Sequence, residues 1–252
     1  GDTGRIDNSK SGSDSAFSLG STWRPWHFLR LWARGDRFFR YPAIDEVVAY
    51  QGYVLTVPFN ADLRSERGWS GEIGADVSFR HFILKVDAFA QDVDGLIAFD
   101  YMQNLNVNLA NATRAGVETG IQGSFGDFRC GIFHTYVKVT FNDGPYDGKE
   151  LYLVPNNQFS GFVEWAPGRF SARIGGQYIQ NCWQGNDFEN KRSKLPGYFV
   201  MNVVLRYRIG QRWHLFAGAD NVLDRRYASL EYSGVWYPAA GLGLRGGVQW
   251  RY

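Results

Sequence analysis

A strict two-residue alternation at the end of the chain constrains its fold more than any other feature. Residues 242–252 read LGLRGGVQWRY, with apolar or aromatic side chains on one parity and Arg245, Gln249 and Arg251 on the other. Because successive side chains of a strand point to opposite faces, this segment predicts a strand with one apolar and one charged face. Such a strand suits the wall of an outer-membrane barrel, with lipid outside and water inside. A half-buried strand of a soluble sandwich would show the same period, so this segment alone leaves both folds open.

The alternation recurs along most of the chain and predicts an all-β fold of eleven strands. In the segment that begins at Phe82, for example, Phe82, Leu84 and Val86 oppose Lys85 and Asp87. Charges on the second parity require a wet or polar interior, because an unpaired charge in a dry core is prohibitive. The predicted strands are 16–23, 27–34, 69–79, 82–93, 114–125, 128–141, 157–165, 169–178, 198–208, 213–222 and 242–252.

The connections between these strands are alternately short and long. The short connections have the Gly, Pro and Asp residues of hairpin turns and lie at 24–26, 80–81, 126–127, 166–168 and 209–212. The long connections lie at 35–68, 94–113, 142–156, 179–197 and 224–241. Short periplasmic turns and long extracellular loops alternate in this way in a transmembrane antiparallel β-barrel, which is the fold that the sequence predicts. Aromatic residues near the strand ends would form interfacial girdles: Phe79, Phe125, Phe128, Trp165, Phe170, Trp213, Trp250 and Tyr252.

Composition agrees with this fold and excludes several classes of protein. No run approaches the roughly eighteen apolar residues that a transmembrane helix needs. A mean hydropathy of −0.32 is compatible with strands whose apolar face is hidden by alternation. A net charge of +2 without a basic tract gives no reason to expect nucleic acid as a partner.

The residue types that carry chemistry are scattered. His27, His81, His134 and His214 lie in or beside separate strands, with no metal-ligand spacing and no serine nucleophile beside them. We therefore expect no enzymatic activity, no metal centre and no cofactor. Cys130 and Cys182 belong to opposite ends of the predicted barrel, beyond disulfide reach, so we expect no bridge between these cysteines.

The strand count has a consequence for closure of the barrel. Eleven is an odd number, whereas single-chain bacterial barrels have an even number of strands, and lipid does not tolerate an open sheet edge. The topology places the start of the chain outside and Tyr252 at the periplasmic side. The sequence therefore predicts part of a barrel, with one overlooked N-terminal strand as the alternative.

Six segments then resemble, in order, the C-terminal half of TonB-dependent outer-membrane receptors. Arg40-Tyr-Pro-Ala-Ile-Asp-Glu46 resembles the family's Arg-x-Pro…Glu segment. A second stretch resembles the family's Asn-x-x-Leu…Glu…Glu-x-Gly pattern and consists of Asn60 through Leu63, Glu66 and Glu72-Ile-Gly74. Its other motifs resemble Asn-Ala-Thr-Arg-Ala-Gly-Val-Glu118, Val154-Pro155, Leu195-Pro-Gly-Tyr198 and Asn221-Val-Leu-Asp224-Arg-Arg-Tyr227, the last with Val-Leu in place of Leu-Phe. Each motif alone is weak, and their shared order is specific.

The resemblance implies a bacterial outer-membrane barrel of 22 strands around an N-terminal plug domain. Residues 1–252 would supply the C-terminal portion of this barrel, without the plug and the N-terminal strands. The expected partners are that remainder of the receptor, TonB acting through the plug, and outer-membrane lipid with lipopolysaccharide. The function implied is active transport of a scarce bulky nutrient of the ferric siderophore or cobalamin class.

Two sets of residues are candidates for binding. Aromatic and cationic residues of the long loops would suit an anionic, partly aromatic ligand, although such aromatics can also simply order the loops. These loop candidates are Tyr146, Tyr152, Trp183, Phe188, Lys191, Arg192, Tyr232 and Trp236. Charged residues of the inner parity would face the plug, or else line a hydrated lumen. These candidates are Lys85, Glu118, Arg173, Arg206 and Arg245.

Three rival functions remain. A passive outer-membrane channel predicts a closed barrel of this chain alone, without a plug. An outer-membrane enzyme or adhesin needs a clustered site, which the sequence does not show. A barrel scaffold would bind another protein rather than a nutrient. What fills the lumen would separate these functions.

Overall fold

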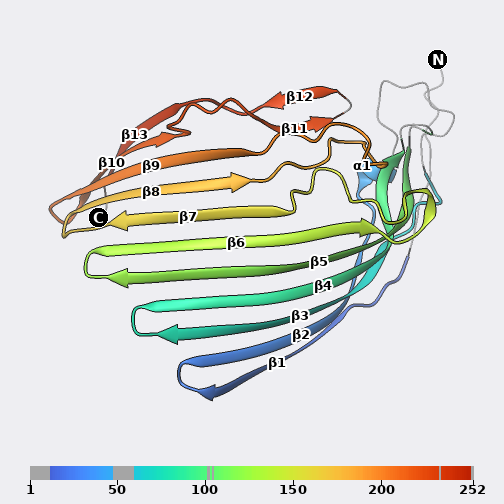
Figure 1. The fold of residues 1–252 in the computed structure, drawn as a ribbon, viewed down its shortest axis with the longest axis horizontal. Helices are drawn as coiled ribbons and strands as arrows, with labels where there is room; N and C mark the ends of the chain where they lie inside the picture. Colours follow the sequence, from blue (N-terminus) through green and yellow to red (C-terminus); the bar gives the residue numbers. More distant parts are fainter. Residues whose placement is uncertain (1–11, 48–59, 101–102, 104, 233, 251–252) are drawn as a thin grey trace.

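The computed structural model of the protein describes residues 12–47, 60–100, 103, 105–232 and 234–250. Eleven strands form one antiparallel sheet in which each strand pairs with its sequence neighbour, except that β13 follows β10 (Figure 1). The strands are β1 Phe17–Trp26, β2 Leu29–Arg40, β3 Glu66–Phe79, β4 Phe82–Asp100, β5 Leu105–Phe125, β6 Phe128–Phe141, β7 Asn157–Trp165, β8 Phe170–Ile179, β9 Tyr198–Ile209, β10 Trp213–Asp220 and β13 Gly243–Trp250. Within the described residues, no helix has the length and apolarity to cross a membrane.

All eleven predicted strands are confirmed, with corrections to their ends. The first tight turn is at His27 and Phe28, two residues later than predicted, because β1 continues through a register shift between Trp23 and Trp26. β2 extends to Arg40 and β3 begins at Glu66, so the long connection there is shorter than predicted. Arg251 and Tyr252 lie outside the described residues.

The predicted loop at 94–113 is wrong, because β4 and β5 continue through most of it. Their pairing extends to Asp100 and Leu105 beyond an irregularity at Gly95, whose φ is +70°. Asparagine is depleted in strands, and Asn106, Asn108 and Asn111 made this segment resemble a loop. Here the asparagine side chains bond neighbouring main chain instead: the Nδ2 of Asn108, for example, donates to the carbonyl of Gly95 at 2.8 Å.

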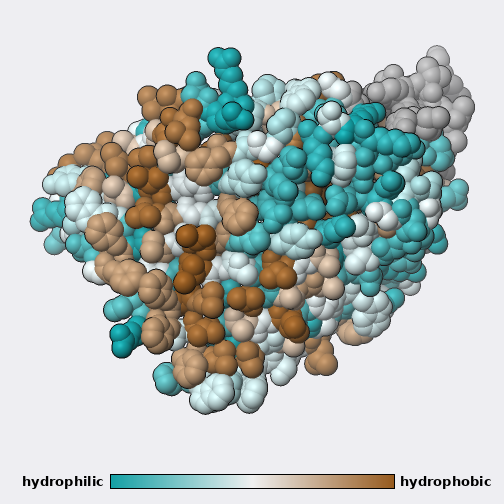
Figure 2. Space-filling model, viewed as in Figure 1, coloured by the Kyte–Doolittle hydropathy of each residue, from teal (hydrophilic) through white to brown (hydrophobic). Residues whose placement is uncertain are grey.

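The pairing register divides the sheet into two faces. One row of directly opposite residues is Leu84, Ile121, Ile132, Gly161, Gly176 and Met201, and it belongs to what we call the apolar face. The opposite parity carries the charges and is called the charged face. Apolar side chains gather over the tight-turn half of the strands, whereas hydrophilic ones cover the loop end (Figure 2). This is the surface expected of a membrane belt with polar loops above it.

Aromatic rings border that belt on the apolar face. Near the tight turns, Phe128 stacks with Trp165 at 6.3 Å between ring centroids, and Trp165 meets Phe170 edge-on at 5.9 Å. Toward the loops, Phe159 lies 4.2 Å from the His134 ring and 6.3 Å from Tyr178. The rings near the tight turns and the rings toward the loops are six to eight residues apart along β6, β7 and β8. They match the interfacial girdles of a membrane barrel.

The sheet is not closed. Among the residues that the structure describes, β1 pairs only with β2, and β13 only with β10. Because all pairings are antiparallel and the strands number eleven, β1 and β13 run in the same direction, from the loop end to the tight-turn end. Within the described residues, both outer edges therefore present unpaired backbone groups, which lipid does not tolerate.

The loops carry small structures of their own. A short helix α1 spans Ile44–Val47, a 3-10 turn η1 spans Gly144–Tyr146, and β11 Ala228–Tyr232 pairs with β12 Val235–Pro238. Cys182 lies in the β8–β9 loop, where it pairs with Leu195, while Cys130 lies near the tight-turn end of β6. Both cysteines are free, as expected from their separation, and burial raises the pKa of the Cys182 thiol.

Candidate functional site: the charged face and the outer loops

All five predicted lumen-facing residues lie on the charged face. Lys85 is opposite Gly120 and Glu118 is opposite Asp87, while Arg173 is opposite Glu164. Arg206 and Arg245 continue the same parity on β9 and β13. The register alone therefore brings these charges to one side of the sheet.

Two ion pairs order part of this charged face. Arg173 lies 3.4 Å from Glu164, with its guanidinium carbon 3.7 Å from the centre of the Phe162 ring. Arg245 lies 3.2 Å from Asp220. These cations are held in place by carboxylates of the neighbouring strands, so the wall presents fixed charges.

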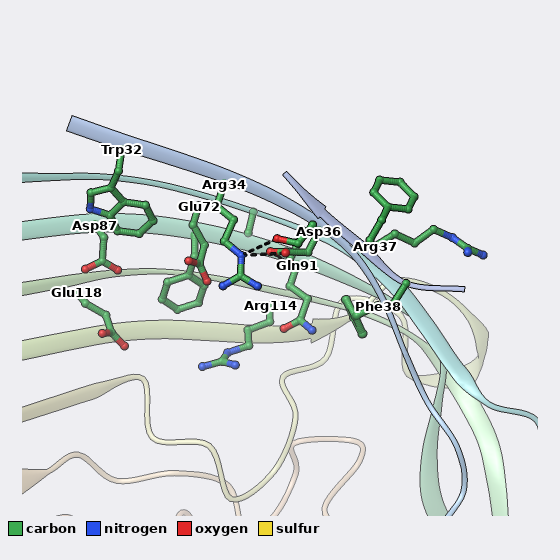
Figure 3. A pocket seen from close by; sticks show the side chains of 16 residues that line it. Trp32, Arg34, Asp36, Arg37, Phe38, Glu72, Asp87, Gln91, Arg114 and Glu118 are labelled. Atoms are coloured by element: carbon green, nitrogen blue, oxygen red, sulfur yellow. Dashed lines mark hydrogen bonds and ion pairs between the residues drawn. The ribbon is translucent and has the colours of Figure 1, made fainter. Parts of the chain in front are cut away.

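A cavity of about 720 Å³ opens on the charged face over β1 to β5. Charged side chains of four adjacent strands surround it, as Figure 3 shows for Arg34, Glu72, Asp87, Arg114 and Glu118. The Nε of Arg34 donates to the carboxylate of Asp36 at 2.8 Å. Such a lining suits water or a polar protein surface rather than lipid.

Three of the loop candidates form the core of the loop layer. The Phe188 side chain is only 3% exposed and packs with Phe141 and Ala112. Its ring lies 5.0 Å from both the Tyr146 and the Tyr152 ring. Burial raises the pKa of Tyr152 to about 12. These contacts support the alternative that such aromatics order the loops, and Phe188 offers no accessible surface to a ligand.

The other loop candidates are more accessible. The Nε1 of Trp183 donates to Glu150 at 3.0 Å, and the Nζ of Lys194 lies 4.5 Å from the ring centre. Lys191 and Arg192 are exposed, and their backbone N–H groups donate to the Asp187 carboxylate at 3.0 and 2.9 Å. This carboxylate therefore fixes the backbone of both cations.

The hairpin candidates also reach the surface. Trp236 is half exposed, and Tyr232 is partly buried at the end of β11. The hairpin is joined to the β8–β9 loop, because the N–H of Gly185 donates to the carbonyl of Glu231 at 2.9 Å. Ligand contact by Trp236, Tyr232, Trp183, Lys191 and Arg192 stays a prediction.

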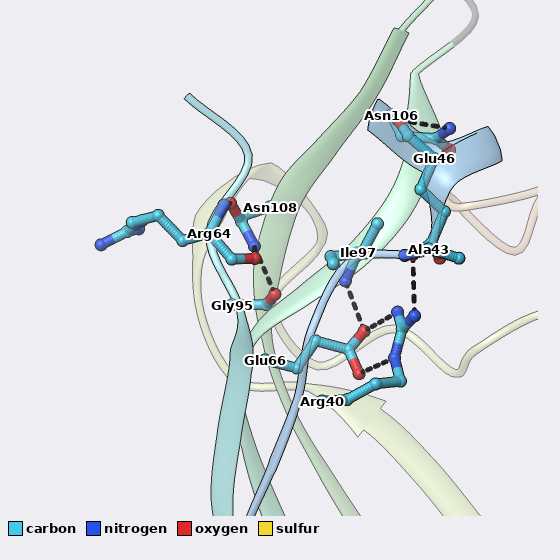
Figure 4. A network of polar contacts seen from close by, with 9 residues as sticks. All are labelled: Arg40, Ala43, Glu46, Arg64, Glu66, Gly95, Ile97, Asn106 and Asn108. Carbon is cyan, nitrogen blue, oxygen red and sulfur yellow. Dashed lines mark hydrogen bonds and ion pairs between the residues drawn. The ribbon is translucent and has the colours of Figure 1, made fainter. Parts of the chain in front are cut away.

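A polar network joins the outer ends of β2, β3 and β4, and it contains motif residues (Figure 4). The Nε and Nη2 of Arg40 donate to the two carboxylate oxygens of Glu66 at 2.7 and 2.8 Å. Its Nη1 donates to Glu46 at 2.8 Å, and Glu66 also accepts the N–H of Ile97 at 2.8 Å.

These hydrogen bonds shift the pKa values of the network. Those from Arg40 to Glu66 and Glu46 raise the pKa of the guanidinium. Burial acts to raise the pKa of Glu46, but the hydrogen bonds from Arg40 and Ala43 outweigh it and lower this pKa. Arg40 and Glu46 are therefore both held in the charged state.

Sequence reasoning missed Asn106 and Asn108, which extend this network together with the motif residue Asn60. The Nδ2 of Asn106 donates to the carbonyl of Glu46 at 3.2 Å, and that of Asn60 to the carbonyl of Asn106 at 2.7 Å. Asn108 accepts the N–H of Arg64 at 2.8 Å. Asn106 and Asn108 are separated by one residue. This spacing was the available signal, because alternate residues of a strand share a face.

The motif that ends at Tyr227 closes the bend after β10. Asn221, with φ of +50°, donates through Nδ2 to the carbonyls of Arg225 and Ala240 at 3.0 and 3.2 Å, and its Oδ1 accepts the Arg225 N–H. Asp224 accepts the N–H of Leu242 at 3.0 Å. This bend therefore joins the loop to the start of β13.

Replacement of Asn221 by alanine is expected to destabilise the protein by about 2–4 kcal/mol. The carbonyls of Arg225 and Ala240 and the Arg225 N–H would lose the buried Asn221 side chain as partner, and a left-handed backbone would lose a residue type that tolerates it. Urea unfolding of the protein in lipid vesicles, followed by tryptophan fluorescence, measures this change. Val222→Ala in the same bend is the control, and an equal loss in both variants would contradict the role of the amide.

Comparison with known proteins adds a family and a fold. A family model described as TonB dependent receptor-like, beta-barrel, matches residues 1–222. Fiu, a ferric-catecholate import receptor of E. coli K12, is 15% identical, with a TM-score of 0.70 over 93% of this chain and 34% of its own. The copper transporter OprC is 17% identical, with a TM-score of 0.78 over 93% and 39%. The ferric citrate transporter FecA is 15% identical, with a TM-score of 0.73 over 94% and 38%.

At these identities the solved structures establish the shared fold. The chain spans between 34% and 39% of the length of the three structures. No curated protein sequence matches the chain significantly.

Proposed function

The chain belongs to the TonB-dependent receptor β-barrel family, and from this membership we propose that it builds the C-terminal part of the wall of an active-transport receptor. Proteins of this family are outer-membrane β-barrels, and the apolar belt with its aromatic borders fits that location. The observation that carries the proposal is the open eleven-stranded sheet whose charged face holds a cavity.

The two open edges define what must complete the barrel. Since β1 and β13 run in the same direction, antiparallel closure needs a segment whose first and last strands both run the opposite way. Such a segment has an odd number of strands. A second copy of this sheet in the same membrane orientation would present strands of the same direction at both seams and could not close antiparallel. The N-terminal strands of the same receptor are the proposed complement.

The charged face is proposed to meet the plug domain. Lys85, Glu118, Arg173, Arg206 and Arg245 would supply polar contacts, which allow the plug to rearrange when TonB pulls on it. An apolar contact between the plug and the wall would instead hold the plug in one position, like the hydrophobic core of a single domain. The cavity of about 720 Å³ on the charged face supports this proposal, because its charged lining is unsuited to lipid.

The proposed substrate is a bulky nutrient of the ferric siderophore or cobalamin class. The neighbours described as ferric-catecholate and ferric citrate receptors support the iron-chelate half of this class, and OprC adds copper as a second metal. Exposed Lys191 and Arg192 beside the aromatic loop core suit an anionic chelate. Lipopolysaccharide phosphates are the competing partner for these cations.

Uptake of labelled ferric siderophores by cells that express the complete receptor tests the proposed function. We expect uptake in cells with TonB and an intact proton gradient, and none after either is removed. Uptake that persists without TonB would establish the rival function of a passive channel. A receptor that captures a protein and transports no chelate would establish the scaffold function.

The double substitution Lys191→Ala/Arg192→Ala is expected to raise the half-saturating chelate concentration about tenfold, as lost charged hydrogen bonds would. Uptake kinetics in whole cells measure this change. Lys149→Ala, which removes another exposed loop cation, is the matched control. An unchanged half-saturating concentration would remove these two residues from the binding site.

A further inference from the structure

The apolar face has a hollow that the transport function does not use. A cavity of about 560 Å³ lies over β4 to β9, with a mostly apolar lining. Its lining includes Gly123, Gly161 and Gly176, together with Phe82 and Phe199. The cavity falls within the size range of protein sites that hold small apolar ligands.

The glycines explain why the surface is hollow at this point. A Cβ on Gly123 would lie 2.6 Å from the Phe82 ring, and one on Gly176 would lie 2.9 Å from the Phe199 ring, so these two rings cover the outer glycines. Within 4 Å, a Cβ on Gly161 would have as its three nearest neighbours the Gly131 carbonyl and two atoms of Ile132, with no ring among them. The floor between the two rings is therefore open.

The cavity faces the hydrocarbon layer, in the half near the tight turns. Cys130 and Ile132 line it, and they follow the girdle residue Phe128 by two and four residues along β6. This spacing is roughly 7–13 Å along the strand. The molecules that can reach such a surface are the acyl chains of the leaflet on the tight-turn side.

Positive charge borders the same end of the cavity. Arg80 and His81 form the turn that leads into Phe82, and the Arg80 guanidinium lies 5.7 Å from the Phe79 ring centre. His81 lies 5.6 Å from the Phe125 ring, which in turn contacts Phe82 at 4.9 Å. The turn is exposed, at the depth where lipid phosphates lie.

We propose that this cavity binds one acyl chain of an anionic phospholipid from the tight-turn leaflet, with its phosphate at Arg80. Apolar burial alone cannot select a lipid, because every site on this face contacts acyl chains. Selection here comes from dispersion contacts along the hollow and from the cation at its end. The site is a preferred lipid position on the outside of the wall, separate from the transport path.

Native mass spectrometry of the complete receptor, titrated with phosphatidylglycerol, tests this site. Val163→Trp/Ile174→Trp fills the hollow with apolar side chains and is expected to weaken binding about tenfold, or about 1.4 kcal/mol. Val86→Trp/Leu205→Trp places the same rings on the same face outside the cavity lining and is the matched control.

A second variant tests the headgroup contact on an exposed turn, where folding is not at risk. Arg80 has φ of +46°, which asparagine tolerates. Arg80→Asn is expected to weaken phosphatidylglycerol binding about fivefold, with a smaller loss for zwitterionic phosphatidylethanolamine, whose ammonium group offsets the charge of its phosphate. Equal affinities of the filled and control variants would overturn the proposal. Preferential binding of lipid A would also overturn it, since that lipid belongs to the opposite leaflet.

Discussion

Replacement of Phe188 by alanine is expected to release the outer loops from one another. The side chain is 3% exposed among Phe141, Tyr146 and Tyr152, and loss of a buried phenyl ring costs about 3–5 kcal/mol. The cost falls on the loop layer, because the β-ladder below is held by its own hydrogen bonds. A loss of about 3 kcal/mol in the stability of the loop layer raises the fraction of molecules with open loops more than a hundredfold. The rate of loop cleavage by added protease measures this rise.

The control separates packing from ligand binding. Trp236→Ala removes an aromatic ring that is half exposed, so we expect little change in cleavage rate. Phe188→Leu retains most of the apolar volume and is expected to fall between the wild type and Phe188→Ala. If Phe188→Ala abolished chelate uptake without any rise in cleavage, Phe188 would be a ligand contact rather than a packing residue.

Replacement of Glu66 by alanine is expected to lower the free energy of unfolding of the receptor by about 2–3 kcal/mol. The change leaves Arg40 without its bidentate partner and the Ile97 N–H without its acceptor. Breaking a fully buried ion pair costs about 3–5 kcal/mol. The Arg40 side chain is 42% exposed, so water recovers part of that cost.

Urea unfolding in lipid vesicles measures this difference as well. Glu189→Ala removes an acid from the exposed pair with Lys191, and we expect no measurable change because both side chains are well hydrated. Glu66→Gln keeps one acceptor for Ile97 and is expected to recover part of the lost stability. Equal stabilities of Glu66→Ala and Glu189→Ala would show that the Arg40 network does not support the fold.

The strands could be predicted from the sequence because each has to satisfy two solvents at once. Lys85 and Leu84 cannot exchange faces, so the alternation of charged and apolar residues fixes which face of the sheet each side chain of β4 takes. Above the membrane belt that constraint ends. Asn106 and Asn108 could then enter a strand without an apolar face, and the alternation that identifies β5 elsewhere was lost.

The candidate site was predicted less well than the fold, for a related reason. An aromatic residue in a long loop is equally suited to packing and to binding, and only its neighbours decide between them. Phe188 packs because Tyr146 and Tyr152 approach it from another loop, which no local pattern reveals. The motif residues Arg40 and Glu66 were recognised by their order, whereas their mutual contact required the β2–β3 register.

The unequal strand lengths have a mechanical consequence. β4 and β5 have 19 and 21 residues, about twice what a membrane crossing needs, whereas β10 and β13 have 8 each. On the β4–β5 side the mouth of the barrel is an extension of the ladder, and bending it would break main-chain hydrogen bonds. On the β9–β13 side the outer end of the wall is made of loops joined by isolated contacts, such as the hydrogen bond from the Gly185 N–H to the Glu231 carbonyl. This part of the wall thus has one stiff side and one pliable side, and a movement of its outer end would come from the pliable one.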